Sequence, residues 1–148
     1  MAHYVTSVST PLSPEEAFAY MADIRRFAEW DPGVTRAVRV KGDGESVGSA
    51  YDLTVKAATT TVMRYEVKAY EAPRRVFLVS RTPLLVSEDE IRVRPAGTGS
   101  VVTYDAVLTL RGPLRLADAA LQVAFRRIGD RAAEGLRRAL RGTEVTSF

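Results

Sequence analysis

The clearest pattern along the chain is a period-two alternation of apolar and polar residues between Val34 and Leu110. The segment 51–56, for example, reads YDLTVK, with its apolar residues at alternate positions. Such alternation is typical of antiparallel strands that bury one face and expose the other. Turns rich in glycine or proline divide the region into six successive strands. In the first of them Val34, Val38 and Val40 share one parity, which predicts that all three are buried.

The N-terminal part of the chain predicts one strand followed by two short helices. Residues 4–10 are rich in β-branched side chains, which favour a strand. Ser13–Glu16 combines a capping hydroxyl, a proline at the first helical position and a glutamate three residues after the serine, and this arrangement starts a helix. Asp23 can cap a second short helix that carries Trp30, the only tryptophan, before a Pro-Gly pair ends it.

From residue 114 to residue 141 the apolar residues recur at helical spacing and no proline interrupts them. This pattern predicts a single helix of about 25 residues, roughly 38 Å long. Such a helix is not stable alone, so we expect its apolar stripe to lie against the sheet. The opposite face carries Arg126, Arg127, Arg131, Arg137 and Arg138.

Four segments carry a resemblance to a known family: SPEEAFAYMAD from Ser13, FAEWDPGV from Phe27, YEVKAYEAPRRV from Tyr65 and LRGPLRL from Leu110. Together with the order of strands and helices, they resemble the polyketide cyclase/dehydrase and lipid-transfer superfamily, the START-like (SRPBCC) proteins of helix-grip fold. The resemblance implies an α+β fold in which a curved antiparallel sheet of about seven strands wraps a long C-terminal helix, with two short helices after the first strand. It covers nearly the whole chain, so we expect a single START-like ligand-binding domain over residues 1–148.

In this fold a cavity lies between the concave face of the sheet and the long helix, and the resemblance implies that a hydrophobic small molecule binds there. We expect Trp30 to close the short helices onto the sheet near one end of the cavity, either as a packing residue or as a ligand contact. The other wall residues are those whose parity or helical spacing assigns them to the inner face. The predicted ligand-binding residues are Trp30, Tyr51, Leu53, Val55, Met63, Tyr65, Phe77, Val79, Ile91, Tyr104, Ala106, Leu108, Leu121, Phe125 and Ile128.

Two polar residues of the predicted inner face are candidates for acid–base catalysis. Asp89 shares parity with Ile91, so its carboxyl either points into the cavity, where desolvation would raise its pKa, or lies in an exposed strand start. In the first case Asp89 could act as a general acid or base, and Tyr104 is the second candidate. The sequence leaves open whether the protein is an enzyme.

Composition excludes several other kinds of catalytic centre. The chain has no cysteine and one histidine, His3, which excludes a thiolate nucleophile and a multi-histidine metal site. A Ser/His/Asp triad would depend on this same histidine at the very start of the chain. We therefore expect neither a metal nor a cofactor.

The formal charge of +3 is uneven, because residues 111–148 carry eight arginines and four acids. Such clustering attracts acidic partners, but no basic stripe is interleaved with aromatic residues, which argues against nucleic-acid binding. No window approaches the roughly 18 apolar residues of a membrane span, and we expect no leader segment and a cytoplasmic location. An oligomer is compatible with the sequence.

The sequence thus supports three functional hypotheses. The first, implied by the resemblance, is a carrier or sequestering protein for a lipid, quinone or polyketide-like compound. The second is a polyketide cyclase or dehydratase that uses the same cavity to orient a reactive chain. The third is an interaction module that contacts a macromolecule through the arginine-rich face of the last helix.

Overall fold

The computed structural model describes residues 1–56, 59–141 and 143–144. These residues form seven long strands, one two-residue strand, three α-helices and two short 3-10 helices. In chain order the elements are β1 (Ala2–Thr10), α1 (Pro14–Met21), η1 (Ile24–Arg26), α2 (Phe27–Trp30), β2 (Val34–Lys41), β3 (Ala50–Lys56), β4 (Thr60–Glu71), β5 (Arg75–Arg81), β6 (Leu85–Ala96), β7 (Gly99–Leu110), η2 (Gly112–Ala117), α3 (Asp118–Leu140) and β8 (Thr143–Glu144).

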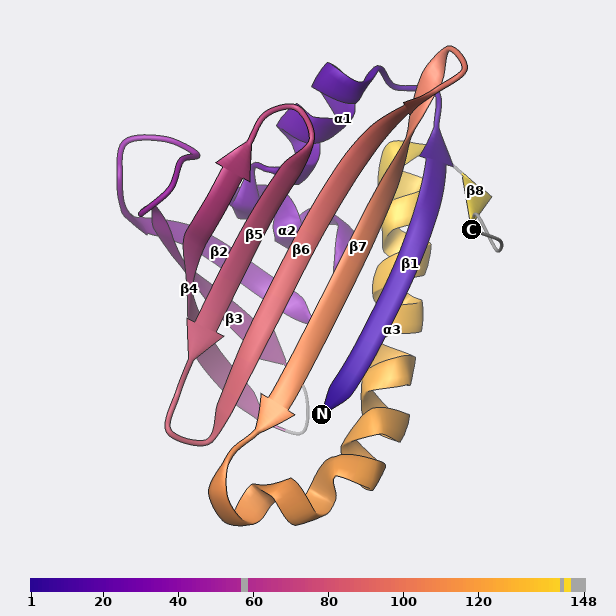
Figure 1. Cartoon of the computed structure of the whole chain (residues 1–148). Coiled ribbons are helices and arrows are strands. Elements are labelled where there is room, and N and C mark those ends of the chain that lie inside the picture. Colours follow the sequence, from indigo (N-terminus) through magenta and orange to yellow (C-terminus); the bar gives the residue numbers. More distant parts are fainter. Residues whose placement is uncertain (57–58, 142, 145–148) are drawn as a thin grey trace.

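All described strands belong to one antiparallel sheet with the order β2-β3-β4-β5-β6-β7-β1-β8. Figure 1 shows that the long strands curve and that the helices lie on the concave side of the sheet. This is the predicted α+β helix-grip architecture. The two-residue strand β8 pairs with Val8 and Ser9 of β1 and adds an edge to the seven strands that were expected.

The start of α1 is built as its sequence predicts. Ser13 Oγ accepts the backbone N–H of Glu16 at 3.2 Å, and Glu16 Oε1 accepts the backbone N–H of Ser13 at 3.4 Å. Asp23 occupies the N-cap position of η1, but its carboxylate accepts from Arg25 and Arg26 rather than from the helix backbone. The prediction that Asp23 caps this helix is therefore wrong, because charge-assisted bonds to two arginines compete with the cap.

The strand β2 departs from simple alternation. Its pairing with β3 shifts twice, once directly after Val34 and once directly after Arg39. Val34 is buried, whereas Val38 and Val40 are 36% and 43% exposed. The prediction that the three valines share one buried face is wrong, because the extra residue of a β-bulge exchanges the two faces of the strand.

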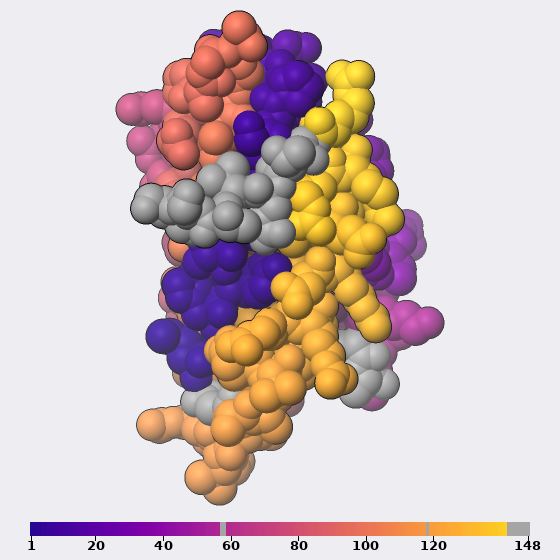
Figure 2. Space-filling model, turned by 90° about the vertical axis from the view of Figure 1, so that its right-hand side faces the viewer, coloured from indigo at the N-terminus to yellow at the C-terminus, as the bar shows by residue number. Residues whose placement is uncertain are grey.

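Helix α3 packs against β1 and α2, and two glycines let it approach them closely. A Cβ atom on Gly135 would lie 1.9 Å from the carbonyl oxygen of Trp30, and a Cβ atom on Gly129 would lie 2.4 Å from the ring of Tyr4. Figure 2 shows the helix running beside β1 on this face of the molecule. A side chain at either position would push the helix away from its neighbours.

Only the C-terminal half of α3 buries its apolar residues. Ala132, Leu136 and Leu140 are at most 5% exposed, whereas Val123 and Ile128 are 62% and 40% exposed. The preceding segment 112–117 forms the 3-10 helix η2 and buries no residue. The expectation that the whole apolar stripe is buried is therefore correct for the second half of the helix, but in the first half Leu121 and Phe125 are only half-buried.

We expect Gly135→Ala to lower the free energy of unfolding by about 2 kcal/mol or more. The added methyl group would meet a backbone carbonyl, and this clash outweighs the roughly 1 kcal/mol that alanine contributes in a helix. Urea denaturation followed by circular dichroism measures the loss. Gly44→Ala is the control, because no heavy atom lies within 4 Å of the methyl group that this substitution adds. Equal stabilities of the two variants would contradict the close approach.

Candidate functional site

The concave side of β6 becomes less buried from one end of the strand to the other. Ile91 is fully buried, Asp89 and Ser87 are each 6% exposed, and Leu85 is half-buried. These four residues alternate along the strand and so share its concave face. The face therefore carries two buried polar side chains directly beside an apolar residue that solvent reaches.

The neighbouring strand β7 shows the same gradient. Tyr104 and Ala106 are buried, whereas Leu108 and Leu110 are half-buried. Leu110 pairs with Leu85 in the register, so the half-buried residues of both strands lie at the same end of the sheet. We call this group the apolar rim; it consists of Val55, Met63, Leu85, Leu108 and Leu110.

Four hydrogen-bonded polar side chains lie next to the apolar rim, and we call them the polar chain. Tyr104 OH donates to Asp89 Oδ2 at 2.6 Å, and Ser87 Oγ donates to Asp89 Oδ1 at 3.4 Å. The hydroxyl groups of Tyr65 and Ser87 are 2.8 Å apart and share a hydrogen bond. All four residues are at most 8% exposed. The sequence left open whether Asp89 is exposed at a strand start or points inward. The first alternative is wrong, because the carboxyl group of Asp89 is buried on the concave face.

Burial shifts the titration of the polar chain. Desolvation raises the pKa of Asp89 from 3.8 to about 6, although the hydrogen bond from Tyr104 acts in the opposite direction. Burial also raises the pKa of Tyr65 and of Tyr104 above its ordinary value, so both phenols keep their protons. Asp89 is thus the member of the chain that can exchange a proton near neutral pH.

Five further side-chain polar atoms are buried without a hydrogen-bond partner among the described residues: Trp30 Nε1, Thr6 Oγ1, Ser80 Oγ, Arg39 Nε and the hydroxyl oxygen of Tyr51. Thr6 pairs with Tyr104 in the register and Ser80 pairs with Ser87, so both hydroxyls flank the polar chain. Buried polar groups without partners are uncommon in folded proteins. Here they supply hydrogen-bonding capacity that an oxygen or nitrogen atom of a bound molecule can use.

Trp30 packs α2 onto the sheet. Its ring centroid lies 5.2 Å from that of Tyr104 in an edge-to-face arrangement and 4.9 Å from that of Phe27. The residue is 2% exposed, and α3 contacts its carbonyl oxygen at Gly135. Trp30, the last residue of α2, therefore contacts both Tyr104 of the polar chain and α3.

The structure sorts the predicted ligand-binding residues into groups. Those that are buried on the concave side are Trp30, Tyr51, Leu53, Tyr65, Ile91, Tyr104 and Ala106; those in the apolar rim are Val55, Met63 and Leu108; Leu121 and Phe125 are half-buried on α3. Ile128 falls outside these groups because its side chain is 40% exposed on the surface of α3.

Two predicted wall residues lie on the wrong face. Phe77 and Val79 belong to the convex face of β5, where the guanidinium carbon of Arg75 lies 5.6 Å from the centre of the Phe77 ring. The concave residues are instead Val76 and Leu78, which pair with Ile91 and Asp89 of β6. The sequence RVFLVS is apolar in both parities, so it does not fix which face is buried.

Sequence reasoning missed Thr6, Ser80 and Arg39. The two hydroxyl residues have the inward parity of buried neighbours such as Leu78, which is the signal that could have found Ser80. Arg39 faces inward because of the bulge in β2, and its guanidinium carbon lies 5.8 Å from the ring centre of Tyr51.

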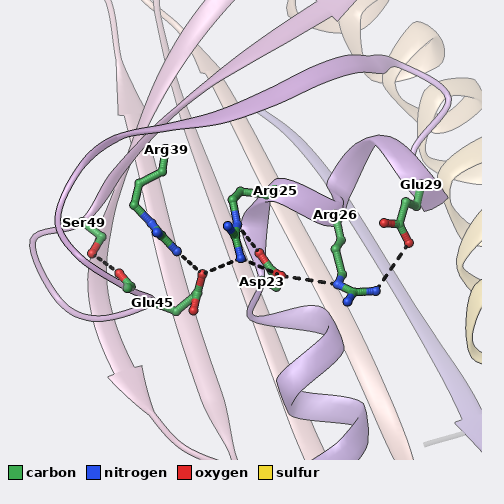
Figure 3. A network of polar contacts seen from close by, with 8 residues as sticks. Asp23, Arg25, Arg26, Glu29, Arg39, Glu45 and Ser49 are labelled. Atoms are coloured by element: carbon green, nitrogen blue, oxygen red, sulfur yellow. Dashed lines mark hydrogen bonds and ion pairs between the residues drawn. The ribbon is translucent and has the colours of Figure 1, made fainter.

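A network of ion pairs holds the β2–β3 loop against η1 (Figure 3). The loop precedes Ala50, so it lies at the end of β3 opposite to Val55 of the apolar rim. Glu45 of the loop pairs with Arg39 of β2 and, at 3.8 Å, with Arg25 of η1. Arg25 in turn pairs with Asp23. Within the loop, Ser49 Oγ donates to the carbonyl oxygen of Gly44. The loop and the helix pair are thereby joined across the end of the concave face.

Two surface hollows lie away from the concave face. One, of about 400 Å³, is lined by convex-face residues that include Arg75, Arg92 and Thr103. The other, of about 510 Å³, adjoins Pro113 and Leu116 of η2. No three metal-binding side chains come together within the described part of the chain. None of the described helices combines the length and the apolar composition needed to cross a membrane.

The curved antiparallel sheet and the long helix α3 define a helix-grip fold. The chain belongs to the family described as polyketide cyclase/dehydrase and lipid transport, whose model matches residues 1–141. A comparison with curated proteins gave no match.

Solved structures share this fold. A START superfamily protein from Mycobacterium smegmatis has a TM-score of 0.78 at 14% identity, with 95% of this chain and 98% of that chain covered. A protein from Thermus thermophilus has a TM-score of 0.76 at 15% identity, with 93% and 96% covered. The di-domain aromatase/cyclase StfQ of the steffimycin biosynthetic pathway has a TM-score of 0.70 at 14% identity, and the match covers 95% of this chain and 50% of StfQ.

We expect Asp89 to reduce stability as the pH rises from about 4 to about 6. Its pKa in the folded state lies above the unfolded value of 3.8, so the folded state binds the proton more tightly, and the stability that protonation contributes is lost as the pH rises through the folded pKa of about 6. This difference in pKa corresponds to about 3 kcal/mol. Urea denaturation of the wild type and of Asp89→Asn at pH 4 and at pH 7 measures it.

The difference in free energy of unfolding between the wild type and Asp89→Asn should change by about 3 kcal/mol between pH 4 and pH 7. Glu88→Gln is the matched control, because Glu88 neighbours Asp89 on the opposite face of β6. Parallel pH profiles for the wild type and Asp89→Asn would show that the carboxyl is not desolvated.

Proposed function

We propose that the protein binds a hydrophobic small molecule, a lipid, quinone or polyketide-like compound, on the concave side of the sheet and acts as a carrier or sequestering protein. The observation that carries the proposal is the continuity between the apolar rim and the polar chain. Leu108 of the rim pairs directly with Ser87 of the chain. A molecule with an apolar body and an oxygen-bearing end matches such a surface.

The rim supplies the wall for the apolar body. Leu85, Leu108 and Leu110 are half-buried, and so are Leu121 and Phe125 on α3. Covering apolar surface of this kind contributes about 25 cal/mol per Å² removed from water. The apolar body would thus provide most of the binding free energy.

The polar chain selects for oxygen at the inner end of the ligand. When Asp89 is ionised, it accepts hydrogen bonds from Tyr104 and Ser87, so the chain offers oxygen lone pairs to a hydroxyl group of a ligand. The indole N–H of Trp30 and the hydroxyl group of Ser80 are donors without partners among the described residues, and they suit a carbonyl oxygen. A hydroxylated or quinone-like ring system satisfies both kinds of group.

A direct test measures the mass of the purified protein by native mass spectrometry before and after extraction with organic solvent. We expect an excess mass that the solvent releases. Titration with naphthoquinones, fatty acids and hydroxylated anthraquinones should then quench or shift the fluorescence of Trp30, which packs edge-to-face on Tyr104 of the polar chain. If no compound of the panel changes either the mass or the emission, the binding function is rejected.

Variants locate the binding. Tyr65→Phe removes one hydroxyl group of the polar chain and should weaken binding about tenfold, since a hydrogen bond in a buried site contributes about 1 kcal/mol or more. Phe77→Leu changes the convex face and should leave the affinity unchanged. Equal losses in the two variants would place the ligand elsewhere.

A second candidate function is a polyketide cyclase or dehydratase that uses the same surface. The observation that favours it is the raised pKa of Asp89, about 6, in contact with Tyr104 at 2.6 Å. A carboxyl with this pKa can give a proton to a ligand oxygen or take one from a ligand carbon near neutral pH. The rim would orient the reacting chain, which by itself lowers the entropic part of the barrier.

Catalysis by Asp89 predicts that Asp89→Asn lowers kcat at least about a hundredfold on an accepted poly-β-ketone substrate, the usual size of a general acid–base contribution. The rate of the wild type should follow a titration near pH 6. Glu88→Gln, on the opposite face of β6, should keep full activity. Unchanged turnover in Asp89→Asn would reject catalysis by Asp89 and would be compatible with the carrier function.

A further inference from the structure

Three connections lie together at one end of the sheet, and we call this end the basic end. They are Lys56 and residues 59–62, the described residues around the turn from β3 into β4, residues 81–85 at the turn from β5 to β6, and residues 110–117 between β7 and α3. The backbone N–H of Arg111 donates to the carbonyl oxygen of Leu84 at 2.7 Å, which joins the last two connections. Figure 1 shows the ends of the strands that these connections join at the lower end of the molecule.

Large apolar side chains project from each connection of the basic end. Leu116 is 94% exposed, Val62 is 58% exposed, Leu84 is 57% exposed and Leu114 is 38% exposed. In Figure 2, η2 and the first turn of α3 project from the bottom of the molecule. Exposed apolar residues that cluster on a protein surface indicate a site of contact with another protein, a membrane or a ligand.

The charges of the basic end have one sign. Its three segments contain Lys56, Arg81, Arg111 and Arg115 and no aspartate or glutamate. At the opposite end of the sheet, the connections 11–16, 42–49, 71–75 and 96–99 contain five acids and two arginines. The molecule therefore carries a positive and a negative end, and the positive end is the one with the exposed apolar side chains.

We propose that the basic end docks on the surface of a membrane that contains anionic lipids. Leucine side chains on protruding loops enter the boundary between head groups and acyl chains, while surrounding cations pair with lipid phosphates and carboxylates. A nucleic acid offers the same negative charge but would use aromatic side chains for stacking, and none occurs in the three segments.

The position of the apolar rim supports a membrane as the partner. Leu85 and Leu110 belong both to the rim and to the connections of the basic end, and they pair with each other in the register. The concave face is therefore least buried where the molecule would meet the lipid. A hydrophobic molecule could move between the bilayer and the concave face without crossing water. The docking surface itself does not depend on the proposed ligand.

The test is flotation of the full chain with vesicles of phosphatidylcholine alone and of phosphatidylcholine with about 30% phosphatidylglycerol. We expect binding to the anionic vesicles that weakens steeply as sodium chloride rises, and little binding to the neutral ones. Arg81→Glu/Arg115→Glu should reduce partitioning about thirtyfold or more, because each basic residue near the surface contributes roughly a factor of five. Leu116→Ser should reduce it about tenfold, since its side chain enters the bilayer.

The matched control is Arg74→Glu/Arg94→Glu, which changes the net charge equally but on exposed arginines away from the basic end. It should bind vesicles about as well as the wild type. Equal losses of vesicle binding in the two double variants, or unchanged binding of Leu116→Ser, would overturn the proposal. Binding would then be explained by the net charge of the protein. Failure to bind anionic vesicles would also overturn it, as would tighter binding to a DNA oligonucleotide that Arg81→Glu/Arg115→Glu abolishes. Circular dichroism checks that each variant is folded.

Discussion

The close approach of α3 to α2 at Gly135 decides how much of the sheet the helix covers. At this point a methyl group would overlap the carbonyl oxygen of Trp30, and a second close approach at Gly129 brings the helix onto Tyr4 of β1. Both contacts hold the C-terminal half and the middle of the helix over one side of the sheet. The first half of α3 is only partly buried, η2 buries no residue, and the ends of β3, β4, β6 and β7 on the concave face are only half-buried. The apolar rim and the basic end both follow from this anchoring.

The concave side includes polar groups where an apolar core would be more stable. Desolvating a carboxyl group costs free energy, and three buried polar atoms near the polar chain have no partner among the described residues. The hydrogen bonds from Tyr104 and Ser87 offset part of the cost to Asp89. Positions that contradict stability in this way are where function is usually found.

The fold was predictable from sequence because its signals are local and repeated. The capping box at Ser13 and the alternation in β3 and β4 identify their elements without any long-range information. The faces of β2 and β5 were not predictable. A bulge exchanges the faces of β2, and the segment 75–80 is apolar in both parities, so only pairing with β6 shows that Phe77 is on the convex side. The exposure of Ile128 was also hidden, because helical spacing marks an apolar stripe but not where its contact with a sheet ends.

The hydrogen bonds of the polar chain have a direction, and the proton on Asp89 sets it. With the carboxylate ionised, the hydrogens of Ser87 and Tyr104 point toward Asp89, and the hydrogen of Tyr65 points toward Ser87. A proton on Oδ1 would be donated to Ser87 instead, the hydroxyl of Ser87 would turn to Tyr65, and the phenol hydrogen of Tyr65 would be released outward. The far end of the chain thus changes from an acceptor to a donor when one proton binds at Asp89, two residues away. The concave face has two complementary hydrogen-bonding patterns in one set of heavy-atom positions.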